Sequence, residues 1–251
     1  MTMRALLFSI FLLFLTSSCM NSSLHLQKIE GEQININDSL SADAKINAFI
    51  KPYKEHIDKQ MDSVLAYSPR ALSKKDTKYN TAIGNMMADA VMAYADPIFK
   101  GRTTFDIDAV LLNFGGIRST LPQGNITMRE AYNIMPFENR VIVLELSGKK
   151  VNELFDYLKQ GTAHPINGLQ LIINDDGAIE ESRIHGKPVD TNETYFIATN
   201  DYLQNGGDHM DFFKNPVSML DLDYKVRNIL IDYFADTDTI APIADDRFIK
   251  R

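Results

Sequence analysis

The apolar residues of this chain change their period after about residue 100, and that change limits the folds open to it. Before this point they recur at spacings of three and four, first from Ile46 to Leu65 and again from Ile83 to Val91. Such spacing is typical of helices with one apolar face. After it, short continuous apolar runs such as Ile107–Leu112 predict buried strands. We therefore expect an α+β fold, in which mixed β-sheets are flanked by helices.

Proline and glycine residues indicate where the helices end or bend. Pro52 lies inside the first apolar pattern, so it either kinks that helix or marks the true start of its main part. The second helix is expected from Thr81 to Tyr94, because Pro97 should close it. A further amphipathic helix is predicted after Ser147, with Gly161 as its stop.

The later elements alternate between strands and helices. The sequence Thr127-x-x-Glu130 has the form of a capping box and predicts a short helix through Ile134. A turn at 174–177 should join two paired strands, and a last helix, about Tyr224–Phe234, precedes a charged tail. The strands are expected at Val141–Leu146, at Leu169–Ile173, around Ile184 and at Tyr195–Thr199.

The N-terminus has the pattern of an export signal. A short basic start, Met1–Arg4, is followed by the apolar run Ala5–Leu15 and then by three small residues, 16–18. The apolar run matches the central region of a secretory signal and is too short to span a bilayer comfortably. A transmembrane anchor that stays attached is the alternative.

Cys19 is the single cysteine of the chain, so a disulfide within the chain is excluded. The segment Thr16–Cys19 resembles a bacterial lipobox, although Thr16 stands where leucine is usual. The resemblance implies that the signal peptide, residues 1–18, is removed and that Cys19 carries the lipid. Diacylation supplies the two chains that stable anchoring requires. We expect a lipid-anchored tether at 19–40, a folded domain at 41–251, and a location outside the cytoplasm, in the periplasm or at the cell surface.

The overall charge argues against one class of partner. The formal net charge is −7, and a nucleic acid polymer would be bound by a field of the opposite sign. A small anionic ligand remains compatible with this charge, because one or two arginines in a pocket act locally.

Two glycine-rich loops follow directly after apolar strands, where open sheets commonly place ligand-binding groups. The first is Asn113–Arg118, whose paired glycines allow a close backbone approach and whose arginine suits a phosphate. The second is Asp201–Asp208, which offers the ring of Tyr202 for stacking and the carboxylate of Asp208. Either loop alone is better explained as a structural turn.

Four segments together resemble the C-terminal, substrate-recognition domain of the 5'-nucleotidase family. Their order and spacing carry the resemblance, which covers about residues 42–234. The segments are Ile83-Gly-Asn-Met-Met-Ala-Asp-Ala90, Asn113-Phe-Gly-Gly-Ile-Arg118, Pro136-Phe-Glu-Asn139 followed by Leu144-Glu-Leu-Ser-Gly148, and Tyr202-Leu-Gln-Asn-Gly-Gly-Asp208.

The resemblance implies a role for each of five residues. Arg118 would contact the phosphate of a nucleotide, and Asn113 would form a hydrogen bond with the base. Phe137 and Tyr202 would hold the base between two rings. Asp208 would hold the ribose hydroxyls.

Two positions depart from the family pattern. Relatives often carry another arginine shortly before the Gly-Asn helix, for a more distant phosphate. Lys78 is the nearest candidate here, so contact with a second phosphate is in doubt. Phe114 stands where many relatives have a small residue, and the larger ring is expected to narrow the pocket.

Catalysis in the family depends on two metal ions in a separate N-terminal domain. Two-metal hydrolysis needs a cluster of His, Asp and Asn ligands, and none of the five histidines here lies in an Asp-x-His or Gly-Asn-His motif. We therefore expect no catalytic residue, metal ligand or cofactor in this chain, and two divalent metals in a separate metallophosphatase chain. A stand-alone nucleoside- or nucleotide-binding lipoprotein is the alternative, and a retained fold with an inactive pocket is a third.

Overall fold

The computed structural model describes residues 3, 26–37 and 39–251 of the chain. The chain divides into two compact units, Met1–Phe49 and Ile50–Arg251. In the first, residues 26–37 are exposed and form no helix or strand. The expected signal peptide and Cys19 lie outside the described residues. Within the described part, no helix has the length and apolar character needed to cross a bilayer.

Helix α2, Ala44–Met61, decides between the two positions left open for Pro52 and ends earlier than the helical spacing predicted. Pro52 lies within the helix and does not mark its start. Val64 and Leu65, which continued the helical spacing, belong to strand β1, Val64–Ser68. The chain changes direction there because β1 pairs with a second strand far along the sequence, which a local pattern does not reveal.

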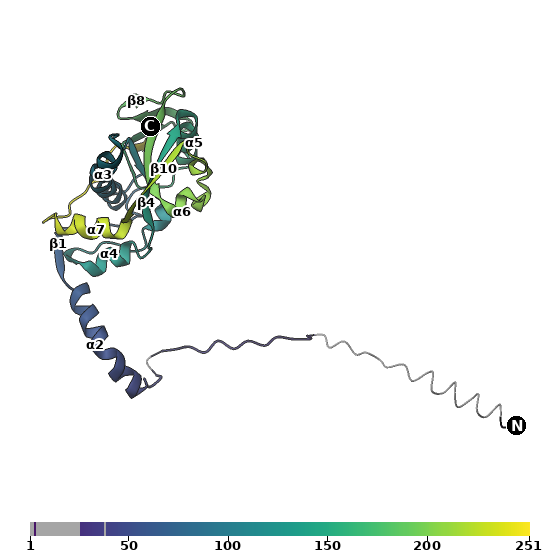
Figure 1. The fold of residues 1–251 in the computed structure, drawn as a ribbon, viewed down its shortest axis with the longest axis vertical. Helices are drawn as coiled ribbons and strands as arrows, with labels where there is room; N and C mark the ends of the chain where they lie inside the picture. Colours follow the sequence, from purple (N-terminus) through teal and green to yellow (C-terminus); the bar gives the residue numbers. More distant parts are fainter. Residues whose placement is uncertain (1–2, 4–25, 38) are drawn as a thin grey trace. The chain divides into compact units, whose positions relative to one another are not determined.

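The second unit is built from three sheets and the helices around them (Figure 1). Its helices after α2 are α3 (Ala82–Thr103), α4 (Met128–Ile134), α5 (Gly148–Leu158), α6 (Asp201–Gln204) and α7 (Val226–Ala235), with 3-10 turns η1 (Phe114–Gly116), η2 (Gly207–His209) and η3 (Asp211–Phe213). Its strands after β1 are β2 (Ala109–Leu111), β3 (Gly124–Thr127), β4 (Arg140–Ser147), β5 (Ile166–Asn167), β6 (Leu169–Ile173), β7 (Ile179–Ile184), β8 (Lys187–Pro188), β9 (Thr194–Asn200), β10 (Ser218–Lys225) and β11 (Phe248–Lys250).

The central sheet has five strands in the order β10-β4-β9-β2-β5, and both of its faces are covered. Alternate residues of a strand point to opposite faces. Val141 and Val143 of β4 therefore pack with α3 and α7, whereas Ile142 and Leu144 pack with α5 and the four-stranded sheet β11-β6-β7-β8. Figure 1 shows α3 and α5 on opposite sides of β4. The predicted α+β class, with mixed sheets flanked by helices, is confirmed.

Helix α3 continues nine residues beyond its expected end at Tyr94, because Pro97 does not stop it. A proline inside a helix costs about 3 kcal/mol. The apolar face that begins near the N-terminus of α3 extends through Val91, Ala95 and Phe99, all of which are buried. Burial of this continued face offsets the cost.

Several local predictions are confirmed. Thr127 and Glu130 form the reciprocal capping box of α4. The apolar face of α5 is buried as its spacing indicated. Strands β6 and β7 pair in antiparallel fashion across the turn at 174–177.

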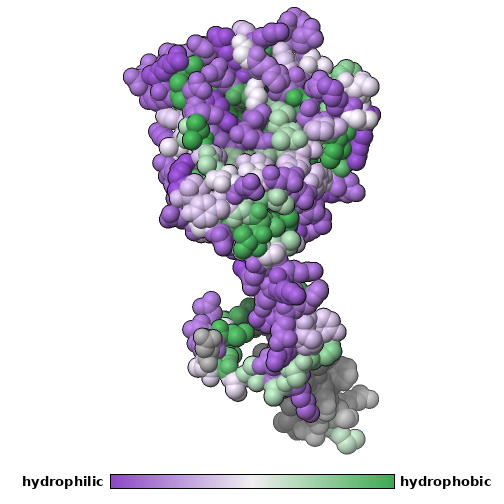
Figure 2. Space-filling model, turned by 90° about the vertical axis from the view of Figure 1, so that its left-hand side faces the viewer, coloured by the Kyte–Doolittle hydropathy of each residue, from purple (hydrophilic) through white to green (hydrophobic). Residues whose placement is uncertain are grey.

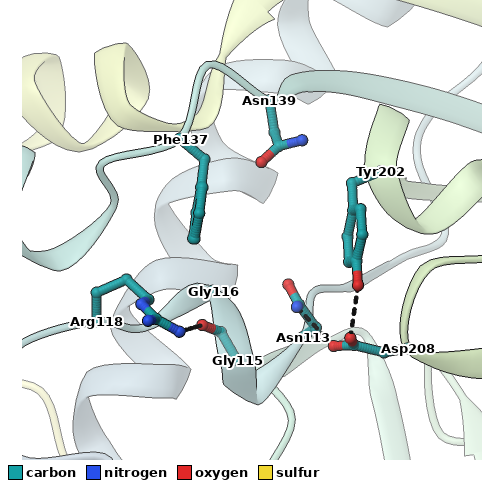
Figure 3. A pocket seen from close by; sticks show the side chains of 8 residues that line it. All are labelled: Asn113, Gly115, Gly116, Arg118, Phe137, Asn139, Tyr202 and Asp208. Atoms are coloured by element: carbon teal, nitrogen blue, oxygen red, sulfur yellow. Dashed lines mark hydrogen bonds between the residues drawn. The ribbon is translucent and has the colours of Figure 1, made fainter. Parts of the chain in front are cut away.

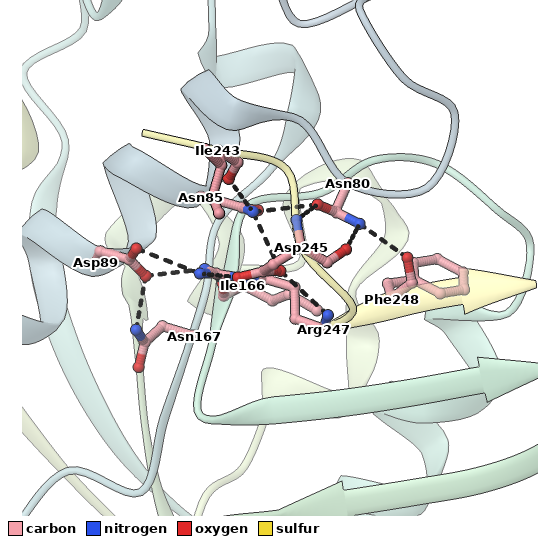
Figure 4. Close-up of polar contacts among 9 residues, drawn as sticks. All are labelled: Asn80, Asn85, Asp89, Ile166, Asn167, Ile243, Asp245, Arg247 and Phe248. Carbon is pink, nitrogen blue, oxygen red and sulfur yellow. Dashed lines mark hydrogen bonds and ion pairs between the residues drawn. The ribbon is translucent and has the colours of Figure 1, made fainter. Parts of the chain in front are cut away.

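The expected charged tail instead contains strand β11, which pairs in parallel with β6. A polar network holds the tail against the start of α3 (Figure 4). The side chain of Asn80 donates to the backbone oxygens of Asp245 and Phe248, both at 2.9 Å. Arg247 lies between two acids and donates to Asp89 and to Asp245, both at 2.8 Å. The bonds of Asn80 and the bond between Arg247 and Asp89 join residues more than 150 positions apart, so the sequence pattern gave no sign of them.

The surface of the second unit in the view of Figure 2 is mostly hydrophilic, with small hydrophobic groups between polar ones. The buried apolar residues form two clusters, one on each face of the central sheet. The unit therefore has an apolar core on each face of this sheet, while some large apolar side chains, such as Phe105, Val217 and Ile243, are exposed.

We predict that Arg247→Met lowers the free energy of unfolding by about 2 kcal/mol, because it leaves two partly buried carboxylates without their cation. Only 16% of the Arg247 side chain is exposed. Denaturant unfolding of the whole chain measures the effect. Arg183→Met is the matched control, because the pair of Arg183 with Glu181 is more exposed and should contribute no more than about 0.5 kcal/mol. Equal losses in the two variants would contradict the importance of the network.

Candidate functional site

Three segments of the chain meet at one edge of the central sheet. Strands β2 and β9 are parallel neighbours, so their C-terminal ends lie side by side. Strand β4 runs antiparallel to β9 and begins at that end, where Val141 pairs with Asn200. The loop after β2, the loop after β9 and the loop before β4 therefore face the same space.

These loops enclose a cavity of about 340 Å³, which lies within the usual range for small-molecule sites. All five residues to which the sequence assigned a binding role line it, together with three others (Figure 3). The lining residues are Asn113, Gly115, Gly116, Arg118, Phe137, Asn139, Tyr202 and Asp208.

The two aromatic rings, Phe137 and Tyr202, face each other across the cavity (Figure 3). Their residues are 41% and 46% exposed, so each ring offers apolar surface to an incoming ligand. Gly207 permits the position of the Tyr202 ring, because a Cβ at 207 would lie 2.4 Å from a ring carbon. Arg227 helps to fix the backbone next to Phe137, because it donates a hydrogen bond to the carbonyl of Pro136 at 3.0 Å.

The acid group of the site is already held by two donors. Asp208 accepts a hydrogen bond from the Asn113 side-chain amide at 2.6 Å and another from the Tyr202 hydroxyl at 2.8 Å. The hydrogen bond to Asp208 raises the pKa of Tyr202, so the phenol remains a donor at neutral pH. The backbone of Asp208 is left-handed, with φ 51° and ψ 27°, a conformation that Asp tolerates better than most residues.

Arg118 supplies a positive charge at the other side of the cavity. Its guanidinium carbon lies 5.7 Å from the centre of the Phe137 ring, and it donates to the Gly115 carbonyl at 3.4 Å. Across the described residues, Arg118 forms no ion pair with a carboxylate. An exposed planar cation of this kind is suited to an anionic group on a ligand.

Asn139 also lines the cavity, although no binding role was expected for it. It stands in the same short segment as Phe137, which was the available signal, and its side chain donates to Asp201 at 2.9 Å. Lys78 does not reach the cavity, because its ammonium lies over the ring of Tyr79 at 5.1 Å. Phe114 does not line the cavity either, so it does not narrow the pocket as expected.

A buried histidine forms a hydrogen bond with the backbone of the turn that begins at Asn113. The backbone N–H of Phe114 donates to Nδ1 of His164 at 3.1 Å. Burial disfavours the charged imidazole and lowers the pKa of His164 to about 4. At neutral pH the ring is therefore uncharged, and its Nδ1 accepts this hydrogen bond.

Metal-ligating residues are not grouped in the part of the chain that the structure describes. Among residues 26–37 and 39–251, no three His, Cys, Asp or Glu side chains lie close enough to hold a metal ion. The described cavity is lined by two rings, one acid and one cation.

Comparison with known proteins identifies the family of this chain. Residues 63–215 match the sequence profile of the family described as 5'-nucleotidase, C-terminal domain. The chain belongs to this family. Among curated relatives, an apyrase from Tabanus yao is 24% identical over 83% of this chain and 42% of the apyrase. A cell wall protein from Listeria monocytogenes is 28% identical over 79% of this chain and 28% of that protein.

Solved structures show the same fold. The 5'-nucleotidase precursor of Thermus thermophilus superimposes with a TM-score of 0.68 at 21% identity, over 81% of this chain and 42% of that one. This chain therefore spans less than half the length of these relatives. The predicted membership of the 5'-nucleotidase C-terminal family is confirmed, and two of these three relatives, the apyrase and the 5'-nucleotidase precursor, are hydrolases by name.

The low pKa of His164 predicts a pH-dependent stability. The unfolded histidine has a pKa of 6.5 and the folded one about 4, so the unfolded state binds more protons between these values. The free energy of unfolding should therefore fall as pH falls through this range, by up to about 3 kcal/mol from this residue. Near His164, the carboxylate of Asp208 is the charged group that opposes the shift.

The measurement is denaturant unfolding at several pH values, on the wild type and on His164→Asn. The variant lacks the titrating ring, so the difference between the two proteins isolates it from the carboxylates that also titrate below pH 5. Parallel pH profiles for the two proteins would refute the prediction.

Proposed function

We propose that this domain recognises a nucleoside or nucleotide and contributes to the hydrolysis of nucleoside phosphates outside the cytoplasm, with a metallophosphatase supplied by another chain. The observation that carries the proposal is the convergence of two rings, one acid and one guanidinium on a single cavity. Membership of the 5'-nucleotidase C-terminal family supports it.

Each proposed contact fits the chemistry of a nucleoside. A flat base between Phe137 and Tyr202 would gain stacking on both faces, at about 1–3 kcal/mol per ring. The carboxylate of Asp208 would accept hydrogen bonds from the two ribose hydroxyls. The amide nitrogen of Asn113 is engaged by Asp208, so its oxygen is the atom available to accept from a base amino group. Arg118 would bind the phosphate through its planar fork.

The length of the relatives supports the role of a partner chain. They are more than twice as long as the region that matches, so each has room for a further domain beside it. We propose that the two divalent metals and their ligands belong to the partner. This chain would hold the nucleoside while the partner cleaves the phosphate ester.

Ligand-induced stabilisation tests the binding role. Adenosine or AMP at about 100 times its dissociation constant should stabilise the whole chain by about 2.7 kcal/mol, seen as a higher melting temperature. Asp208→Ala should remove this stabilisation, because the ribose loses its acceptor. Asp211→Ala is the matched control, since Asp211 is exposed, pairs with Lys214 and lies outside the cavity. Binding that survives in Asp208→Ala would show that the pocket is not used in this way.

A second substitution separates the phosphate contact from the nucleoside contacts. Arg118→Met should lower the affinity for AMP about 10- to 100-fold, because a charge-assisted hydrogen bond is lost. The affinity for adenosine should stay within about twofold of the wild-type value. Calorimetric titration of both ligands measures this, with Arg183→Met as a surface arginine control. An equal loss for AMP and adenosine would mean that Arg118 acts on the pocket as a whole.

Co-purification tests the partner. If the chain binds adenosine or AMP but neither associates with nor stimulates a metallophosphatase, the split-enzyme proposal fails. The chain is then a stand-alone binding protein. If neither ligand binds, the fold has been retained with an inactive pocket.

The membrane anchor belongs to the same proposal. The apolar run before Cys19 and the similarity to a cell wall protein support export. We propose that Cys19 is diacylated and attaches the chain to a membrane. Labelling of bacteria with a fatty acid analogue should modify the wild type and leave Cys19→Ser unlabelled.

A further inference from the structure

Two side chains outside the cavity each form a hydrogen bond with one of the two glycine-rich loops. The first is Tyr157, near the C-terminal end of α5, whose hydroxyl donates to the backbone carbonyl of Asp208 at 2.9 Å. The second is His164, whose Nδ1 accepts a hydrogen bond from the backbone N–H of Phe114 at 3.1 Å. Each side chain therefore binds the backbone of a different loop, and neither lines the cavity.

The two side chains also contact each other. The rings of Tyr157 and His164 lie 5.4 Å apart with an interplanar angle of 46°, and Tyr157 packs edge-on against Phe212 at 5.6 Å. His164 is buried, with 7% of its surface exposed. The pair therefore forms one packed unit that links the loop after β2 to the loop after β9.

The loop after β9 has particular need of such support. Asp208 is held in a left-handed conformation at φ 51°, and His209 follows it at φ 59°. Such backbone is unfavourable for a residue with a Cβ and persists where its surroundings fix it. A hydrogen bond to the Asp208 carbonyl fixes the peptide plane that follows the acid, and so the direction in which its side chain points.

The loop after β2 is fixed in the same way. Phe114 begins the 3-10 turn η1, and the N–H that His164 accepts belongs to the residue directly after Asn113. The Asn113 side chain must reach Asp208 at 2.6 Å. That short contact exists only if both loops keep their positions, and Tyr157 and His164 hold one loop each.

We propose that Tyr157 and His164 are positioning residues for nucleoside binding, which hold the Asn113–Asp208 pair in the geometry that receives the ribose and base. This inference rests on the proposed function, and it assigns the pair no contact with the ligand. A role in core packing alone would affect the stability of the fold and leave the affinity of the folded protein unchanged.

Tyr157→Phe is the decisive variant, because it removes one hydroxyl and keeps the ring packing. We expect the affinity of the whole chain for adenosine to fall about three- to tenfold, the worth of one hydrogen bond, at a temperature where both proteins are folded. Tyr195→Phe is the matched control: its hydroxyl accepts from the backbone of Asp190 at 2.8 Å, and Tyr195 lies at the other end of β9. It should bind adenosine as the wild type does.

The histidine is tested by a pair of variants. His164→Leu removes the acceptor for Phe114 and should weaken adenosine binding. His164→Asn places an amide oxygen near the position of Nδ1 and should restore most of the affinity. Amide hydrogen exchange gives a readout without ligand: the loops at 113–118 and 206–209 should exchange faster in Tyr157→Phe than in Tyr195→Phe.

The outcomes are distinct. If the wild type binds adenosine and Tyr157→Phe binds it equally well, with unchanged exchange in both loops, the positioning role is refuted while the proposed function stands. If the wild type binds neither adenosine nor AMP, the proposed function fails and this inference fails with it.

Discussion

The site depends on the pairing of three strands. Because β2 and β9 are parallel, segments that are about 90 residues apart in sequence leave the sheet at the same edge. The antiparallel β4 enters at that edge and adds the loop with Phe137. Without this pairing, Asn113 and Asp208 could not form a hydrogen bond of 2.6 Å. The two apolar faces of the sheet are buried by α3 and α7 on one side and by α5 on the other, which fixes the register that this contact needs.

The sequence revealed those parts of the site whose chemistry is local. Paired glycines, an arginine and an acid after short apolar runs predicted two loops, and the resemblance joined them to Phe137. The structure brings these residues into one cavity. Their individual roles stay predictions. The fold class followed from the change of hydrophobic period, since helical and strand spacing differ physically.

The features that the sequence did not reveal depend on distant partners. Pro97 remains inside α3 because a buried face continues past it. Strand β11 was expected to be a charged tail, and its place is set by β6 and by the Arg247 network. His164 was considered only as a metal ligand, because nothing near it in sequence indicates that it accepts the N–H of Phe114. In each case, tertiary packing overrides or adds to a local preference.

The hydrogen bonds that Asp208 accepts from Asn113 and Tyr202 explain how one carboxylate can be fixed in direction and still accept further hydrogen bonds. An ionised carboxylate has about four acceptor positions. Asn113 and Tyr202 use one oxygen each, so about two positions remain for hydroxyl groups of a ligand. The vicinal diol of a ribose presents two such donors side by side. The protein's own bonds thus orient the carboxylate without saturating it, and a sugar that lacks one hydroxyl would leave an acceptor position without its donor.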